Sequence, residues 1–245
     1  MLSYIKLFLL IIHIIICSVL ALIFAIVDRS HHLYFRLSKF FSWGVLFLSG
    51  VKLNITGLER LEKGKPYIFV SNHSSQFDIP TLQFAFPQET CIVFKKELGN
   101  IPLFGWQMRL GPYIMIDRDN RESAARSIEV ARKVMSEKGR SIVLYAEGTR
   151  SRTGEVQPFK RGAFYLAARV GFPIVPVSIS GAENILPKGK FNIKGGIINV
   201  HFAEPIMTDN IKTRKDELDL MEKVREIIIE HRNIENNSNK IINVS

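Results

Sequence analysis

Cysteine is scarce in this 245-residue chain, which contains only Cys17 and Cys91. Cys17 lies in an apolar run and Cys91 in a predicted strand, so the pair offers neither a disulfide framework nor the spacing of a zinc site. Both cysteines are interpreted as structural residues. Internal repeats and low-complexity linkers are also lacking, and the expectation is one sizeable domain with an appendage.

Charged residues are absent from Leu7–Val27, a run dense in Ile and Leu. At 1.5 Å per residue, a helix of this length crosses a hydrocarbon core of about 30 Å. The run is interpreted as a retained membrane anchor, with His13 as a helix-interface or interfacial residue rather than a ligand. The alternative is a cleaved signal peptide, whose apolar stretch would be shorter and would end in a small-residue cleavage site.

Acidic residues are fewer than basic ones: the chain has 23 Asp and Glu and 33 Lys and Arg, which gives a net charge of +10. This excess indicates an anionic partner, either nucleic acid or an acidic lipid surface. The apolar N-terminal run favours the lipid surface, and the chain has no RNA-binding signature. We therefore expect an anionic membrane surface as a partner and no nucleic acid. The 47% hydrophobic content excludes a disordered protein.

A second amphipathic segment, Leu33–Leu48, follows a basic, polar break at Asp28–His32. Its Phe and Trp residues mix with Arg36 and Lys39, a combination typical of the headgroup boundary. Two interpretations stay open: a hairpin that enters one leaflet, or a single span followed by an interfacial helix. In both, residues 1–50 form a membrane anchor, and the cations beside it place the following domain in the cytoplasm.

Residues 51–210 alternate short apolar runs with amphipathic ones, which predicts an α/β domain. The fold class expected is a mixed, largely parallel sheet with helices on both faces. The clearest predicted helices are Arg121–Lys138, which ends at Gly139, and Gly162–Val170. Residues 211–245 are predicted to form a charged amphipathic helix, Lys215–Glu230, and a frayed Asn-rich tail from Asn233. The predicted strands are Leu53–Thr56, Tyr67–Val70, Cys91–Phe94, Tyr113–Ile116, Ile142–Tyr145, Ile174–Ile179 and Ile197–Phe202.

The segment Ser71–Pro80, SNHSSQFDIP, follows a predicted buried strand and leads into a helix that begins near Phe77. His73 and Asp78 are the candidate reaction centre, with the imidazole as general base and the carboxylate as its orienting partner. Residues five apart lie about 140° apart on one helix, so the two side chains converge only if one precedes the first turn. A capping Asp beside a polar loop His is the alternative.

A second polar segment, Tyr145–Arg150, reads YAEGTR and also follows a predicted strand. Gly148 allows a sharp turn and a close approach of the backbone to a ligand, and the planar fork of Arg150 suits phosphate oxygens. Lys95 and Arg118 lie at or just past the ends of two further strands. Cations from several strand ends indicate one anion site, whereas a plain turn with solvated cations is the alternative.

These blocks together resemble the glycerolipid acyltransferases typified by 1-acylglycerol-3-phosphate acyltransferase. The resemblance covers roughly 65–181 and keeps the family's order of blocks. Ala146 departs from it, since the family commonly has proline there; the change removes no functional group. The matching residues are Asn72, His73, Ser75 and Asp78, then Lys95, Glu97, Leu98, Pro102, Gly105, Gly111 and Arg118, then AEGTR at 146–150, and finally Val175–Gly181.

The resemblance implies that His73 deprotonates the acceptor hydroxyl as it attacks the thioester of acyl-CoA or acyl-carrier protein, while Asp78 holds the imidazole. Glu147, Gly148, Thr149, Arg150, Arg118 and Lys95 would bind the substrate. Glu147 is expected to position Arg150 or a glycerol hydroxyl, and backbone N–H groups at the start of the helix after His73 are expected to bind the oxyanion. The product would be phosphatidic acid, formed from 1-acyl-glycerol 3-phosphate at a bacterial inner membrane.

No metal and no cofactor other than the acyl donor is expected. Ser74 and Ser75 lack a GxSxG elbow, so direct transfer is favoured over an acyl-enzyme. Three alternatives stay open: another acceptor such as a lyso-ornithine lipid, a lysophospholipid or glycerol 3-phosphate; a membrane-tethered thioesterase; and, on charge alone, a tethered nucleic-acid-binding module.

Overall fold

The computed structural model describes the backbone of residues 2–117, 121–186 and 193–242. These residues form an α/β fold whose seven-stranded sheet has the order β1-β7-β6-β2-β5-β3-β4. The strands are β1 Val51–Thr56, β2 Ile68–Ser71, β3 Thr90–Lys95, β4 Ile114–Ile116, β5 Ser141–Tyr145, β6 Ile174–Ser180 and β7 Gly196–Phe202. All seven predicted strands are confirmed. The β6–β7 pair is antiparallel and the other pairs are parallel, so the mixed, largely parallel sheet is confirmed as well.

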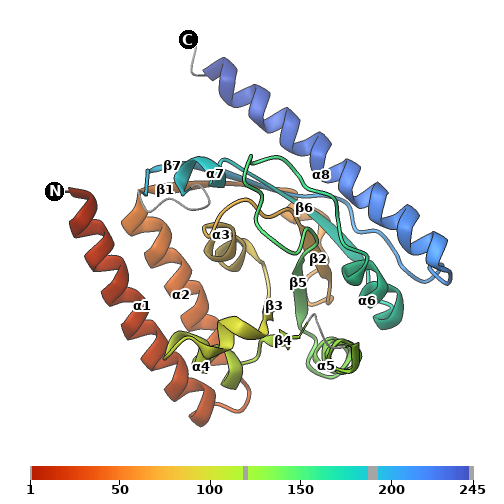
Figure 1. The fold of residues 1–245 in the computed structure, drawn as a ribbon, viewed down its shortest axis with the longest axis horizontal. Coiled ribbons are helices and arrows are strands. Elements are labelled where there is room, and N and C mark those ends of the chain that lie inside the picture. The colour runs from red at the N-terminus through yellow and green to blue at the C-terminus, as the bar shows by residue number, and fades with distance from the viewer. Residues whose placement is uncertain (1, 118–120, 187–192, 243–245) are drawn as a thin grey trace.

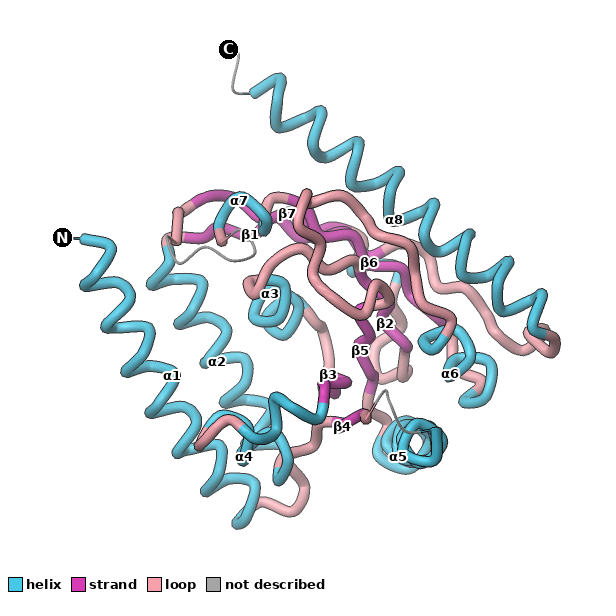
Figure 2. Tube along the Cα trace, in the orientation of Figure 1, coloured by secondary structure: helices cyan, strands magenta, loops and turns pink. Residues whose placement is uncertain are grey.

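Helices flank the strands on both sides, as Figure 2 shows. The helices are α1 Leu2–Val27, α2 His32–Ser49, α3 Asp78–Ala85, α4 Phe104–Leu110, α5 Arg121–Lys138, α6 Gly162–Val170, α7 Ala182–Ile185 and α8 Arg214–Ile242, with short 3-10 turns η1 Leu58–Arg60 and η2 Lys96–Asn100. The predicted bounds of α5 and α6 are confirmed, and Gly139 has a φ of 62° at the end of α5, where a left-handed residue terminates a helix.

Alternate residues of the central strands supply two separate apolar cores. Phe69 of β2 packs with residues of α2 and α3, such as Leu46 and Leu82. Its neighbours Ile68 and Val70 pack instead with residues of α5, α6 and α8. This division follows from the pleat of a strand, which directs successive side chains to opposite faces. Both faces of the sheet are therefore buried, as the sequence predicts.

The first two helices form a hairpin that lies against α3 and α4 (Figure 1). His13 of α1 makes a hydrogen bond between its Nε2 atom and the carbonyl oxygen of Phe41 in α2, at 3.0 Å. A Cβ on Gly44 would lie 2.3 Å from the same Nε2 atom, so glycine is required for this close approach. The prediction that His13 is an interface residue is confirmed.

Much of the hairpin's outer surface is apolar. Residues Ile5–Val27 form a helix long and apolar enough to cross a membrane, and only 22% of its 18-residue apolar window is buried. On α2, the exposed rings of Phe40, Trp43 and Phe47 stack in a row. The opposite side of α2 is buried by the domain, with Tyr34 and Leu46 among its buried residues. The two helices thus present one apolar outer surface while α2 belongs to the packed fold.

The C-terminal helix differs from the sequence prediction. We expected a frayed tail from Asn233, but α8 continues to Ile242. Residues 233–242 contain neither glycine nor proline, and asparagine lowers helix stability by less than about 1 kcal/mol per residue. An Asn-rich composition alone therefore does not end this helix. The predicted end at Glu230 was wrong.

Candidate active site

The candidate site lies where two neighbouring parallel strands end. Ser71, the last residue of β2, pairs with Tyr145, the last residue of β5. The loops that follow these strands carry His73 and Glu147, and they emerge at the same edge of the sheet. Ligand sites in open α/β folds collect at such carboxyl ends. The sheet register therefore brings together two segments that lie about 70 residues apart in the sequence.

His73 and Asp78 meet as the spacing requires, because His73 precedes α3 and Asp78 is its first residue. The Nδ1 atom of His73 lies 2.7 Å from Oδ2 of Asp78, whose side chain is fully buried. With Nδ1–H donating to the carboxylate, Nε2 is the nitrogen left for proton transfer. The side chain of His73 is 15% exposed, so the imidazole reaches a solvent-connected space.

The rest of His73 is held equally firmly. Its main-chain N–H donates to Oε1 of Glu147 at 2.7 Å, and its carbonyl oxygen accepts from the N–H of Ser151 at 2.8 Å. The imidazole stacks on the ring of Tyr145, with centroids 4.1 Å apart. Burial, followed by the charge of Asp78, raises the pKa of Tyr145 well above its usual range, so this ring stays neutral.

Glu147 connects the two loops of the site. Its carboxylate accepts from the N–H of His73 and, through Oε2, from the N–H of Gln157 at 3.2 Å. The residue is only 3% exposed and does not line the cavity described below. Glu147 thus joins the two loops and does not reach the space where a substrate hydroxyl would lie, whereas the expectation that it positions Arg150 stays a prediction. Burial raises its pKa to about 7 against the opposing effect of both N–H donors.

Four main-chain N–H groups that follow His73 make contacts within their own loop. The N–H groups of Ser74 and Ser75 donate to Oδ2 of Asp78 at 2.7 and 2.8 Å. Those of Phe77 and Asp78 donate within the loop, to the hydroxyl and carbonyl of Ser75. These four N–H groups hold the loop and the buried carboxylate of Asp78, and the assignment of N–H groups at the start of the helix to an oxyanion stays a prediction.

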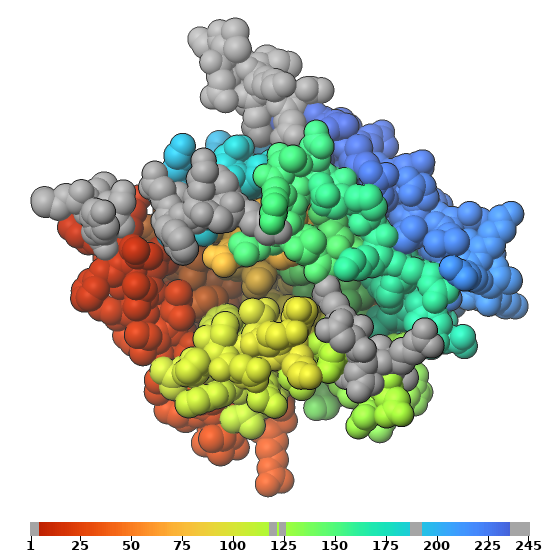
Figure 3. All heavy atoms as spheres, in the orientation of Figure 1, coloured from red at the N-terminus to blue at the C-terminus, as the bar shows by residue number. Residues whose placement is uncertain are grey.

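A cavity of about 320 Å³ opens beside His73. The predicted site residues that line it are His73, Lys95, Gly148, Thr149 and Arg150. The remaining wall is largely apolar and comes from α1, α2, α3, β3 and α4. Figure 3 shows the hollow on this face, between the yellow segment near residue 100 and the green segment near residue 150. One space therefore joins the imidazole to two cations and to the N-terminal hairpin.

The predicted anion-binding residues are only partly brought together. Arg150 and Lys95 both line the cavity, although Lys95 also pairs with Glu97 at 3.1 Å on the surface. Gly148 has a φ of 73°, so the turn before Arg150 uses the left-handed conformation that glycine adopts without strain. Arg118 lies outside the described residues, and its assignment stays a prediction.

Asn72 is a residue whose role the sequence did not indicate. Its side-chain amide donates to the carbonyl oxygen of Ile179 at 2.9 Å and accepts from the N–H of the same residue at 2.8 Å. This pair of bonds fastens the His73 loop to β6. A partner 107 residues away leaves no local pattern in the sequence, so only the family motif singled Asn72 out.

These features can be compared with known proteins. A family profile described as Acyltransferase matches residues 52–180, the stretch that contains both loops. The chain belongs to this acyltransferase family. It is 37% identical over 166 residues to 1-acyl-sn-glycerol-3-phosphate acyltransferase of Limnanthes douglasii, which covers 68% of this chain and 58% of that protein. It is 33% identical over 210 residues to the Saccharomyces cerevisiae enzyme of the same name, covering 84% of this chain and 68% of that protein.

Among solved structures, the acyltransferase chain resembles the crystal structure of the 1-acyl-sn-glycerophosphate (LPA) acyltransferase PlsC from Thermotoga maritima. The TM-score is 0.80 and the sequence identity 23%, with 96% of this chain and 95% of that chain covered. At this identity the likeness shows a shared fold, which includes the N-terminal helical hairpin because nearly the whole chain is matched.

Proposed function

We propose that this chain transfers a fatty acyl group to the sn-2 hydroxyl of 1-acyl-glycerol 3-phosphate and so makes phosphatidic acid. The observation that carries the proposal is the single cavity lined by His73, Arg150 and the apolar hairpin. A base, a phosphate-binding fork and an apolar wall are the groups that this lipid substrate needs. The names of the relatives in the plant and in yeast support the same acceptor.

The proposed chemistry is direct transfer. Nε2 of His73 takes the proton of the acceptor hydroxyl as its oxygen attacks the thioester carbonyl carbon of acyl-CoA or acyl-carrier protein. The tetrahedral intermediate then expels the thiolate, which takes up that proton from the imidazolium. Asp78 stabilises the imidazolium through the 2.7 Å contact with Nδ1 and fixes the tautomer. Neither step needs a metal ion or a further cofactor.

Binding is assigned to the cations of the cavity. The guanidinium of Arg150 would hold the acceptor phosphate by charge-assisted hydrogen bonds, with Lys95 and Arg118 assisting and the Gly148–Thr149 turn close by. Fixing the phosphate restrains an otherwise flexible lipid, which brings its free hydroxyl near His73. The acyl chain of one of the substrates would lie in the cavity against its apolar wall.

We propose further that the hairpin holds the enzyme at a membrane, with the catalytic domain on the cytoplasmic side of a bacterial inner membrane. The apolar surface of α1 and the exposed aromatic rings of α2 support insertion. Lipid substrate and product stay in the bilayer whereas the acyl donor arrives from water. An active site next to the hairpin meets both, and the net charge of +10 favours acidic lipid.

An acceptor panel tests the proposal. Purified protein receives one acyl donor and, in separate reactions, 1-acylglycerol 3-phosphate, glycerol 3-phosphate, a lysophospholipid, a lyso-ornithine lipid or 1-acylglycerol without phosphate. The lipid product is measured by mass spectrometry, and the released thiol is measured by a colorimetric assay. We expect phosphatidic acid to form fastest, with equal release of thiol. Equal rates with and without the acceptor phosphate would refute the phosphate assignment, and free fatty acid in place of lipid would show a thioesterase.

A further inference from the structure

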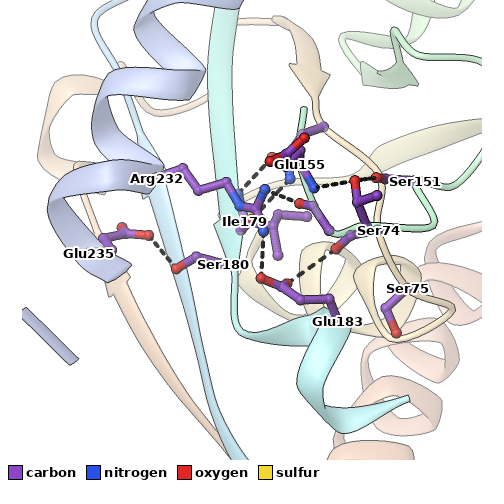
Figure 4. Close-up of polar contacts among 12 residues, drawn as sticks. Ser74, Ser75, Ser151, Glu155, Ile179, Ser180, Glu183, Arg232 and Glu235 are labelled. Atoms are coloured by element: carbon purple, nitrogen blue, oxygen red, sulfur yellow. Dashed lines mark hydrogen bonds and ion pairs between the residues drawn. The ribbon is translucent and has the colours of Figure 1, made fainter. Parts of the chain in front are cut away.

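The buried face of α8 changes character along its length. Leu220, Val224 and Ile228 lie one turn apart and pack into the apolar core beneath the helix. One turn later the same face presents Arg232, which is only 6% exposed. Glu235 follows and accepts a hydrogen bond from the hydroxyl of Ser180 in β6, at 2.7 Å. The helix therefore replaces apolar packing with buried charge where it passes the edge of the sheet that carries the active site (Figure 4).

Arg232 contacts two segments of the fold at once. Its Nη2 atom donates to Oε1 of Glu183 in α7, and its Nη1 atom donates to the carbonyl oxygen of Gly154. Gly154 has a φ of 84°, and a Cβ there would lie 3.2 Å from the Glu183 side chain. The loop after Arg150 is thus shaped to lie directly against this ion pair.

Glu183 continues the chain of contacts to the catalytic loop. Its Oε2 atom accepts a hydrogen bond from the hydroxyl of Ser74 at 3.4 Å, which Figure 4 shows. The main-chain N–H of Ser74 donates to Oδ2 of Asp78, the oxygen that also accepts from His73. Arg232 is therefore connected to the His73–Asp78 couple through two side chains and one peptide group.

The Gly154 contact reaches the same couple from the other side. Gly154 belongs to the loop in which the N–H of Ser151 donates to the carbonyl oxygen of His73. The N–H of Gln157, later in this loop, donates to Glu147, which holds the N–H of His73. One guanidinium on α8 consequently braces both loops that hold the proposed base.

Packing alone does not account for this arrangement. A buried ion pair costs several kcal/mol of desolvation per ion, and well-packed apolar residues of similar volume are often as stable or more stable. The apolar stripe of Leu220, Val224 and Ile228 has only to continue for one more turn to cover the same surface. The polar pair thus points to a requirement of the adjacent loops rather than of the core.

We propose that Arg232, acting through Glu183 and Ser74, is a positioning residue that fixes the Ser74 N–H on Asp78 and so holds the His73 imidazole for proton transfer. This inference rests on the proposed acyl transfer. It assigns a role in turnover to the C-terminal helix, which carries no motif of the family. Neither Arg232 nor Glu183 lines the cavity, so the role is indirect.

The test replaces the ion pair by apolar residues, in the double variant Arg232→Met and Glu183→Met. Without the Glu183 acceptor the Ser74 peptide is released, and we expect kcat to fall about tenfold with both KM values within about twofold of wild type. Fewer N–H donors leave more negative charge on Asp78 beside the imidazolium, so the acidic limb of the kcat/KM profile should move to higher pH. The unfolding temperature should stay near that of the wild type.

Ser74→Ala is the second variant, because it removes only the hydroxyl that links Glu183 to the loop. It should reproduce the loss of kcat and the displaced pH profile even if the double variant folds poorly. The matched control is Arg225→Met with Glu222→Met, a pair on the same helix whose atoms lie 3.1 Å apart and of which Glu222 is exposed and Arg225 partly buried. This control should retain the wild-type kcat and pH profile.

Wild-type values of kcat and pH profile in a folded Ser74→Ala variant would overturn the inference, and so would the same result in a folded double variant. A wild-type protein that fails to acylate any lysolipid would overturn the proposed function instead. The two failures are therefore distinguishable in one set of assays.

Discussion

The main-chain N–H of His73 donates to the carboxylate of Glu147 at 2.7 Å, across 74 residues of sequence. This bond joins the NHSSQFD loop to the EGTR loop, so the base and the cationic turn form one rigid unit. Glu147 is consequently a support for the site rather than a contact for the substrate. The cost of this support is a buried carboxylate whose pKa is raised to about 7.

The raised pKa predicts a specific dependence of stability on pH. Since the folded-state pKa lies above the usual 4.5, the native state holds a proton between these values that the unfolded chain has lost. The contribution of Glu147 to the free energy of unfolding is fully present below pH 4.5 and is lost as pH rises through about 7. The change is on the order of 3 kcal/mol. The unfolding free energy of Glu147→Gln minus that of the wild type should therefore increase from pH 5 to pH 8.

Unfolding free energies from denaturant titrations of both proteins, at several pH values in that range, measure this difference. Glu155→Gln is the control, because Glu155 is an exposed carboxylate in the same loop. The control should follow the wild type at every pH. If the difference between Glu147→Gln and wild type is the same at pH 5 and pH 8, Glu147 does not titrate as described.

Arg150→Ala tests the phosphate assignment. A charge-assisted hydrogen bond contributes about 1.5–3 kcal/mol, so the KM for 1-acylglycerol 3-phosphate should rise about 10- to 100-fold while the KM for the acyl donor changes little. Arg152→Ala is the matched control, since Arg152 is exposed in the same loop and does not line the cavity. An unchanged acceptor KM and kcat in Arg150→Ala would remove the assignment.

The exposed rings of Phe40, Trp43 and Phe47 predict a dependence on membranes. Replacing all three by serine should weaken binding to vesicles that contain acidic lipid, because aromatic rings at the interface are anchors. Activity on substrate in vesicles should fall, and activity on substrate in detergent micelles should not. Met207→Ser with Leu218→Ser removes two exposed apolar residues elsewhere and should change neither. Equal losses in vesicles and micelles would mean that the rings stabilise the fold instead.

Gly44 controls the approach of α1 to α2. In Gly44→Ala the new methyl group would overlap His13, which must then move and lose its 3.0 Å bond to Phe41, at a cost of about 1–2 kcal/mol. Thermal unfolding in detergent measures the loss. Gly162→Ala, where a Cβ meets no other atom within 4 Å, should be neutral or slightly stabilising. Equal unfolding temperatures for the two variants would contradict a tight helix contact.

Local patterns were sufficient for the strands and for most helices, although α4 and α7 were not predicted. Most strands are short apolar runs between turn residues, β1 alternates apolar with polar residues, and α5 has a clear apolar stripe with a glycine stop. The end of α8 was not predicted correctly, because the length of this helix depends on the absence of a helix breaker rather than on its composition. The order of the strands in the sheet could not be predicted from local patterns either, since β2 lies between β5 and β6 in space.

The candidate site was predictable only where its residues share a segment. His73 and Asp78 are five residues apart, and their contact follows from a helix that begins at Asp78. The contacts of Glu147 with His73, of Asn72 with Ile179 and of Arg232 with Glu183 span 74, 107 and 49 residues. Such contacts arise from strand register and helix docking, so the link that Glu147 makes between the two loops could not be predicted from a local pattern.

The most direct test of the account is a comparison of wild type and His73→Ala in one transfer assay, with acyl-CoA and 1-acylglycerol 3-phosphate. Circular dichroism and the unfolding temperature establish that both proteins are folded. The account predicts phosphatidic acid and an equal amount of free CoA from the wild type, and a rate at least about 100-fold lower from His73→Ala. A folded His73→Ala variant that makes phosphatidic acid at the wild-type rate would contradict it.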